Sequence, residues 1–146
     1  MVALNIPADL HFEVSESVII KAPIEVSFRS LIDEMTHANE AGAGNPMPMV
    51  LECFPGGRWY RDLGDGQGHC WGFVQAIRKP TLLEISGPLF MSSAVSNNLQ
   101  YRLKAVDDGT ELRLRHSAFG VIDPAHRTGV SRGWHELLER VVRRAV

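Results

Sequence analysis

The sequence predicts an α+β fold in which a mostly antiparallel sheet packs against a long C-terminal helix. Three observations predict it: an amphipathic helix over residues 123–146, a run of short strands over residues 49–118 with no helix between them, and an early helix directly after the first strand. Helices segregated from a run of antiparallel strands are typical of this class. The 146 residues fit a single domain, which we expect to span residues 1–146.

The first strand is expected over residues 10–21, where apolar and polar side chains alternate. Ala22 and Pro23 end this strand, and Pro23 opens the helix that follows it. One face of that helix is apolar and should pack on the sheet; its members are Ile24, Phe28, Leu31, Ile32 and Met35.

Residues 36–48 are rich in Ala, Gly, Asn and Pro, so we expect a mobile loop. Strand-forming residues between turn signals then predict strands over residues 49–54, 58–63, 68–77, 81–86, 98–106 and 110–118. The strongest hairpin signal is Asp107-Asp108-Gly109, which joins the last two. Alternation in these two strands assigns a set of side chains to the concave face of the sheet: Leu99, Tyr101, Leu103, Leu112, Leu114, His116 and Ala118.

The C-terminal helix is predicted by an apolar stripe at helical spacing, formed by Val130, Trp134, Leu137, Leu138, Val141 and Ala145. Asp123 suits the N-cap and Pro124 suits the first helical position. Gly129 and Gly133 are unusual, because each costs roughly 1 kcal/mol relative to alanine inside a helix. Two explanations stand side by side: the close approach of the sheet or of a ligand, and a frayed first turn.

Composition and charge narrow the classes of partner. Hydrophobic residues make up 45% of the chain, charged residues 22%, and the formal net charge is −2, so nothing favours binding to nucleic acid. The sequence contains no run of eighteen apolar residues and no secretory signal at its N-terminus, so we expect a cytoplasmic protein that does not insert into a membrane. In that reducing compartment we expect Cys53 and Cys70 to be free and buried.

Metal and nucleophile sites lack the spacing that they require. The six histidines form no ligand pair at helical or hairpin spacing, so we expect neither a metal nor a cofactor. A Gly-x-Ser-x-Gly nucleophile motif is also missing. His116 is the best single candidate for acid–base chemistry, with Tyr101 beside it on the concave face. The alternative is that His116 is a hydrogen-bonded core residue.

Aromatic and aliphatic side chains spread over the strands and the last helix suggest a small-molecule site, although they could also form an ordinary core. The predicted ligand-binding set is Trp59, Trp71, Phe73, Leu83, Ile85, Phe90, Met91, Tyr101, Leu103, Leu112, Leu114, His116 and Trp134. Within residues 86–96, Leu89-Phe90-Met91 places large apolar residues in a predicted loop. Such a loop forms an interface, a pocket rim or a buried edge of the core.

Local motifs accompany this order of elements. They are Ala22-Pro23-Ile24-Glu25-Val26-Ser27-Phe28 at the first helix, Pro55-Gly56-Gly57-Arg58 between the second and third strands, Gly72-Phe73-Val74 followed by Pro80 and Leu82, and Gly133-Trp134 with Leu137 and Leu138. Together they resemble the START-like or SRPBCC helix-grip superfamily, and within it the family similar to the activator of heat-shock-protein-90 ATPase homologue. The resemblance covers nearly the whole chain.

The resemblance implies a curved antiparallel sheet of about seven strands wrapped around the C-terminal helix, a short helical segment after the first strand, and a cavity between sheet and helix that is open at one end. Many relatives carry a tryptophan after the first helix, where this chain has the loop of residues 36–48.

The expected function is the binding of a small hydrophobic or aromatic molecule without catalysis. The alternatives are a polyketide cyclase or aromatase that uses His116 and Tyr101, and a co-chaperone-like interaction module. A homodimer that forms through Leu89–Met91 is a further possibility.

Overall fold

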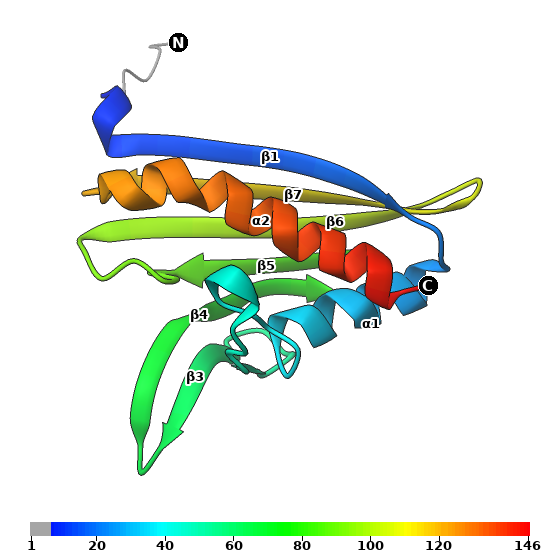
Figure 1. Cartoon of the computed structure of the whole chain (residues 1–146), viewed down its shortest axis with the longest axis horizontal. Helices are drawn as coiled ribbons and strands as arrows, with labels where there is room; N and C mark the ends of the chain where they lie inside the picture. Colours follow the sequence, from blue (N-terminus) through cyan, green and yellow to red (C-terminus); the bar gives the residue numbers. More distant parts are fainter. Residues whose placement is uncertain (1–6) are drawn as a thin grey trace.

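A computed structural model describes residues 7–146 and contains one seven-stranded antiparallel sheet with strand order β1-β7-β6-β5-β4-β3-β2 (Figure 1). The strands are β1 (His11–Ile20), β2 (Val50–Leu51), β3 (Arg58–Gly64), β4 (Gln67–Arg78), β5 (Leu82–Gly87), β6 (Val95–Val106) and β7 (Gly109–Gly120). The helices are α1 (Ile24–Met35) and α2 (Pro124–Arg144), with short 3-10 turns at Ala8–Leu10 and Gly42–Gly44. The predicted α+β helix-grip fold is confirmed.

Helix α2 runs along one face of the curved sheet (Figure 1). As predicted, Asp123 caps the helix: its Oδ1 accepts a hydrogen bond of 2.8 Å from the backbone N–H of Ala125, and Pro124 follows in the first turn. The buried face of α2 consists of Val130, Trp134, Leu137, Leu138 and Val141. These residues confirm the predicted stripe except at Ala145, which is the C-cap and is half-buried. Burial of this stripe against the sheet supplies most of the stability of the helix.

Helix α1 packs on the C-terminal half of α2 through polar contacts as well as apolar ones. The Ser30 hydroxyl donates to the backbone carbonyl of Val141 across 2.7 Å. Glu34 is buried, and its two carboxylate oxygens accept hydrogen bonds from Nε of Arg140 (2.8 Å) and Nε of Arg144 (2.6 Å). The two helices are therefore joined by a carboxylate held between two guanidinium groups.

The space directly beneath α2 is filled by side chains. The fully buried residues of the inner face include members of every strand from β5 to β7: Leu83, Ile85, Leu99, Tyr101, Leu112, Leu114 and His116. They pack against Leu138 and Val141 of α2, which are also completely buried. Between α2 and strands β5 to β7, the expected cavity is therefore a packed core.

The β3–β4 hairpin extends away from the helices (Figure 1), and residues 67–70 at its end are exposed. Cys70 lies there and is exposed, so the prediction that it is buried was wrong: the hairpin leaves the core before this residue. Cys53 is half-buried and follows β2, which ends at Leu51 rather than at residue 54. Both cysteines are free, as predicted.

Residues 36–48 form a hydrogen-bonded loop. Backbone bonds join Met47 N to Asn39 O and Ala41 N to Asn45 O, both at 2.8 Å, and Met49 N to Thr36 O at 3.0 Å. The Asn39 side chain adds a bond of 2.9 Å to the carbonyl of Met47. The loop is therefore closed at its base like a short hairpin, and its tip contains the turn Gly42–Gly44.

Candidate ligand-binding site

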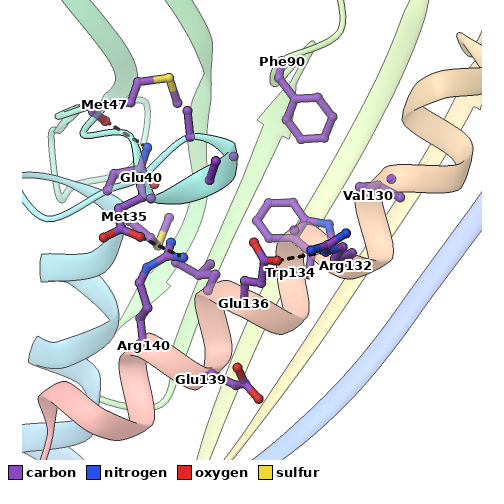
Figure 2. A pocket seen from close by; sticks show the side chains of 18 of the residues that line it. Met35, Glu40, Met47, Phe90, Val130, Arg132, Trp134, Glu136, Glu139 and Arg140 are labelled. Carbon is purple, nitrogen blue, oxygen red and sulfur yellow. Dashed lines mark hydrogen bonds and ion pairs between the residues drawn. The ribbon is translucent and has the colours of Figure 1, made fainter.

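An open pocket of about 1040 Å³ lies along α2, on the side that faces the loop of residues 36–48 (Figure 2). Its walls come from α2, the end of α1, this loop, the first halves of β3 and β4, and the β5–β6 connection. The lining residues are Met35, Asn39, Glu40, Ala41, Gly42, Ala43, Gly44, Met47, Trp59, Trp71, Phe90, Ala125, His126, Gly129, Val130, Arg132, Gly133, Trp134, Glu136, Leu137, Glu139, Arg140 and Arg143.

Aromatic rings form a continuous row on one side of the pocket. The ring centroids of Trp59 and Trp71 are 5.1 Å apart, those of Trp71 and Phe90 are 5.7 Å apart, and those of Phe90 and Trp134 are 6.3 Å apart. The first two pairs are edge-to-face, which is favourable at these distances, and the Phe90–Trp134 pair is tilted at 55°. The row joins residues of the β3–β4 hairpin, the β5–β6 connection and α2.

Trp59 is held in place by the end of α1. Its indole Nε1–H donates to the backbone carbonyl of Met35 across 3.0 Å. The last carbonyls of a helix lack partners within the helix, so this bond satisfies one of them. Trp59 is almost completely buried, and it joins the aromatic row to the first helix.

Phe90 reaches the pocket because its neighbours are anchored in the core. Leu89 and Met91 are buried, and the Leu89 backbone N–H donates to Trp71 O across 2.7 Å. Leu89 has a φ of 53°, an uncommon conformation for a residue other than glycine. Gly87 before it passes so close to β4 that a Cβ would lie 2.5 Å from Gly72 Cα. The apolar segment is thus a buried edge of the core at Leu89 and Met91 and a pocket rim at Phe90.

Gly129 and Gly133 open the helical wall of the pocket. Apart from the adjacent backbone of α2, a Cβ placed on either residue would meet no atom of the described residues within 4 Å, so the close approach of the sheet does not explain them. Both line the pocket one turn apart, in line with Ala125. Larger side chains at these positions would occupy space that is now open.

His116 is a hydrogen-bonded core residue. Its Nδ1 accepts from the indole N–H of Trp134 across 2.9 Å, and its Nε2 lies 2.6 Å from the amide oxygen of Asn97. The amide nitrogen of Asn97 donates onward to the carbonyl of Pro88 across 3.1 Å. This pattern requires a neutral imidazole with its proton on Nε2. Burial lowers the pKa of His116 from 6.5 to about 4, which favours the same neutral form.

Tyr101 lies on the inner face of β6 and is completely buried. Its hydroxyl finds no hydrogen-bond partner among the described residues. Burial raises the pKa of this hydroxyl above its ordinary value, because ionisation is unfavourable away from water. Neither Tyr101 nor His116 lines the pocket, so these two groups would not contact a ligand bound there as an acid–base pair.

The structure brings part of the predicted ligand-binding set to the pocket. Trp59, Trp71, Phe90 and Trp134 line it. Phe73 is half-exposed and lies outside it. The remaining members are buried in the core instead: Leu83, Ile85, Met91, Tyr101, Leu103, Leu112, Leu114 and His116.

Several lining residues were missed by the sequence reasoning. Met47, Glu40 and the small residues of the tip come from the loop of residues 36–48, which faces α2 across the pocket in Figure 2. Arg140 was not among the residues predicted to bind a ligand. The paired glycines of α2 were the one sequence signal that pointed to the open wall.

Charged groups also line the pocket. Arg132 pairs with Glu136 at 3.0 Å, and Nη1 of Arg140 lies 3.5 Å from Oε2 of Glu40. Residues 7–146 contain no group of three or more His, Cys, Asp or Glu side chains that could hold a metal ion. No helix in the same part of the chain is long and apolar enough to span a bilayer.

Solved structures resemble the chain over nearly its whole length. A protein of Rhizobium leguminosarum that is described as uncharacterised has a TM-score of 0.71 at 16% identity, covering 92% of this chain and 94% of its own. The AHSA1-like protein of Aeromonas hydrophila has a TM-score of 0.64 at 18% identity, covering 91% of each chain. The di-domain ARO/CYC protein StfQ from the steffimycin biosynthetic pathway has a TM-score of 0.65 at 13% identity, covering 94% of this chain and 52% of its own.

At these identities the likeness establishes the fold alone. No curated protein matches the chain. A family model does match residues 21–144, which include β2 to β7 and both helices. The chain belongs to the family described as Activator of Hsp90 ATPase homolog 1-like protein.

Proposed function

We propose that this protein binds a small hydrophobic or aromatic molecule in the pocket beside α2. The observation that carries the proposal is the open pocket of about 1040 Å³ with its row of four aromatic side chains, Trp59, Trp71, Phe90 and Trp134. Small-molecule sites are concave, mostly apolar and of roughly this size or somewhat smaller, with a few polar groups that orient the ligand.

The composition of the walls supports this class of ligand. Met35 and Met47 add flexible, polarisable side chains that adapt to different apolar shapes. The tip of the loop and the glycines of α2 contribute almost no side-chain bulk. The pocket is thus wide and its walls are mostly apolar, and it resembles a binding site more than an acid–base active site.

A catalytic role of the cyclase or aromatase type has less support. It would require His116 or Tyr101 to contact the ligand, and both are completely buried outside the pocket lining. Both ring nitrogens of His116 already have hydrogen-bond partners. Ligand binding without proton transfer by these two groups is therefore the proposal we favour.

The test is titration of the purified protein with an environment-sensitive naphthalene-sulfonate dye and with pyrene, monitored by fluorescence. We expect saturable binding that Gly133→Leu weakens, because the leucine side chain would project into the open wall. Ser131→Leu is the matched control: it adds the same side chain to an exposed position of α2 that does not line the pocket.

Gly133→Leu should also fold, since leucine favours the helix and a Cβ at residue 133 meets no atom of residues 7–146 within 4 Å beyond the adjacent backbone of α2. Equal loss of binding in both variants would indicate a general surface effect. Absence of saturable binding to the wild-type protein, or binding that Gly133→Leu leaves intact, would reject the proposed site.

A further inference from the structure

We propose that the ligand of this pocket is an amphipathic acid, whose carboxylate binds Arg140 in place of Glu40 while its apolar body lies against the aromatic row. The inference rests on the proposed function and adds the chemical class of the ligand. The observations behind it are the ion pairs that the charged lining residues form with one another.

Arg140 is the least exposed of the arginines that line the pocket. Only 16% of its side chain is exposed, compared with 85% for Arg132. A guanidinium that is shielded from water binds a carboxylate more strongly than one that is fully hydrated. Arg132 is also engaged with Glu136 on its own helix, at 3.0 Å.

Arg140 has donors to spare. Its Nε–H donates a hydrogen bond of 2.8 Å to Glu34. Within residues 7–146 the Arg140 side chain forms no other hydrogen bond. The guanidinium carries five N–H donors in a planar fork that matches a carboxylate. Its two Nη groups are thus available to a bidentate partner.

Glu40 already forms an ion pair with one of those donors, but the contact is long. Its Oε2 lies 3.5 Å from Nη1 of Arg140, longer than a charge-assisted hydrogen bond of about 2.8 Å. The Glu40 side chain is 34% exposed and belongs to the loop, so it can turn into solvent. In Figure 2 a dashed line joins the Glu40 carboxylate to the Arg140 guanidinium beside Met35.

Removal of Glu40 from Arg140 would leave the helix pairing intact. Glu34 keeps both of its partners, because Arg144 binds its other oxygen at 2.6 Å. The cluster of Glu34, Arg140 and Arg144 then has one positive charge in excess, which an acid would neutralise. The site thus accepts an anion without the loss of a buried ion pair.

The dimensions limit the ligand. Arg140 lies six residues after Trp134 on α2, which corresponds to roughly 9 Å along the helix axis. An acid whose charged group is separated from a ring system by a short linker would span this distance. A neutral apolar molecule would occupy the aromatic row and leave Arg140 with Glu40.

Pyrenebutyric acid and its methyl ester form a suitable pair of probes, since they differ only in the charged group. Fluorescence titration of the wild-type protein should show roughly tenfold tighter binding of the acid. Glu40→Gln removes the internal competitor, so it should tighten binding of the acid by roughly threefold and leave binding of the ester unchanged.

Glu139→Gln is the matched control, because Glu139 also lines the pocket and the change in net charge is identical. If both variants tighten binding of the acid equally, long-range charge is responsible and the Arg140 site is wrong. If acid and ester bind the wild-type protein equally, or if the acid preference does not respond to Glu40→Gln, the inference is overturned while the pocket proposal stands. If neither probe binds, the proposed function fails as well.

Discussion

Trp134 of α2 donates its indole N–H to Nδ1 of His116 on β7, across 2.9 Å and within the buried core. The bond joins the helix to the sheet at the point where Trp134 also forms part of the pocket wall. From His116 the connection continues through Asn97 to the carbonyl of Pro88, two residues before Phe90. Trp134 and the segment that carries Phe90 are thus connected through one neutral imidazole.

The first prediction concerns the dependence of stability on pH. The pKa of His116 is about 4 in the folded protein and 6.5 as its ordinary value, so the unfolded chain binds a proton more readily. The neutral form therefore stabilises the fold fully above pH 6.5, and this contribution is lost as the pH falls towards 4. The difference of about 2.5 pH units corresponds to about 3 kcal/mol. Urea unfolding between pH 7.5 and 4 should show it.

His116→Gln removes this titration, so the variant should lose less stability on acidification than the wild-type protein. His69→Gln, at an exposed histidine of the β3–β4 hairpin, should behave like the wild type. Parallel pH profiles for wild type and His116→Gln would show that another group is responsible.

The second prediction tests the Trp134 bond itself. Trp134→Phe keeps an aromatic ring but leaves Nδ1 of His116 buried without a donor, which should cost about 1–3 kcal/mol of unfolding free energy. Chemical denaturation measures this loss. Trp71→Phe provides the comparison, because the indole N–H of Trp71 forms no hydrogen bond within the described residues and the pocket is also lined by Trp71. An equal cost for the two substitutions would mean that ring size, and not the hydrogen bond, matters.

The third prediction concerns the carboxylate between α1 and α2. Glu34→Gln should destabilise the protein by roughly 3 kcal/mol, because Arg140 and Arg144 would lose the negative partner in a site where Glu34 is only 5% exposed. The hydrogen bond that Arg144 donates to Glu34 raises the pKa of Arg144, so the arginine stays charged. Glu136→Gln breaks the exposed pair with Arg132 and should cost less than about 0.5 kcal/mol. A thermal melt in which both variants shift equally would contradict the buried-pair interpretation.

The fourth prediction separates a core role of Tyr101 from a catalytic one. Its hydroxyl is buried and has no hydrogen-bond partner within residues 7–146, so Tyr101→Phe should leave stability unchanged or raise it by up to about 1 kcal/mol. Binding of pyrene to the pocket should be unaffected, since Tyr101 is not in the lining. A loss of more than about 1 kcal/mol in urea unfolding would reveal a hydrogen bond that the hydroxyl makes in solution.

Local patterns were sufficient for the elements of the fold. The stripe from Val130 to Val141 and the alternation around Leu112 and Leu114 depend on periods of 3.6 and 2 residues, which can be read along the chain. The same patterns failed at boundaries where neighbours decide: β6 begins at Val95 instead of residue 98, because its first residues pair with the end of β7. They also placed Cys70 inside, although the hairpin carries it beyond the core.

The sequence by itself determined the fold class, the buried face of the C-terminal helix and an aromatic-rich interior. Only the tertiary structure decided which inward side chains fill the core and which border open space. Alternation gives Tyr101 and His116 an inward direction, but the depth of packing over them depends on α2. The pocket depends on distant segments that meet: the loop with Glu40, the bend that presents Phe90, and the glycines that leave the helix wall open. Contacts between such distant segments arise from packing in three dimensions, and the periodicity of one segment does not predict them.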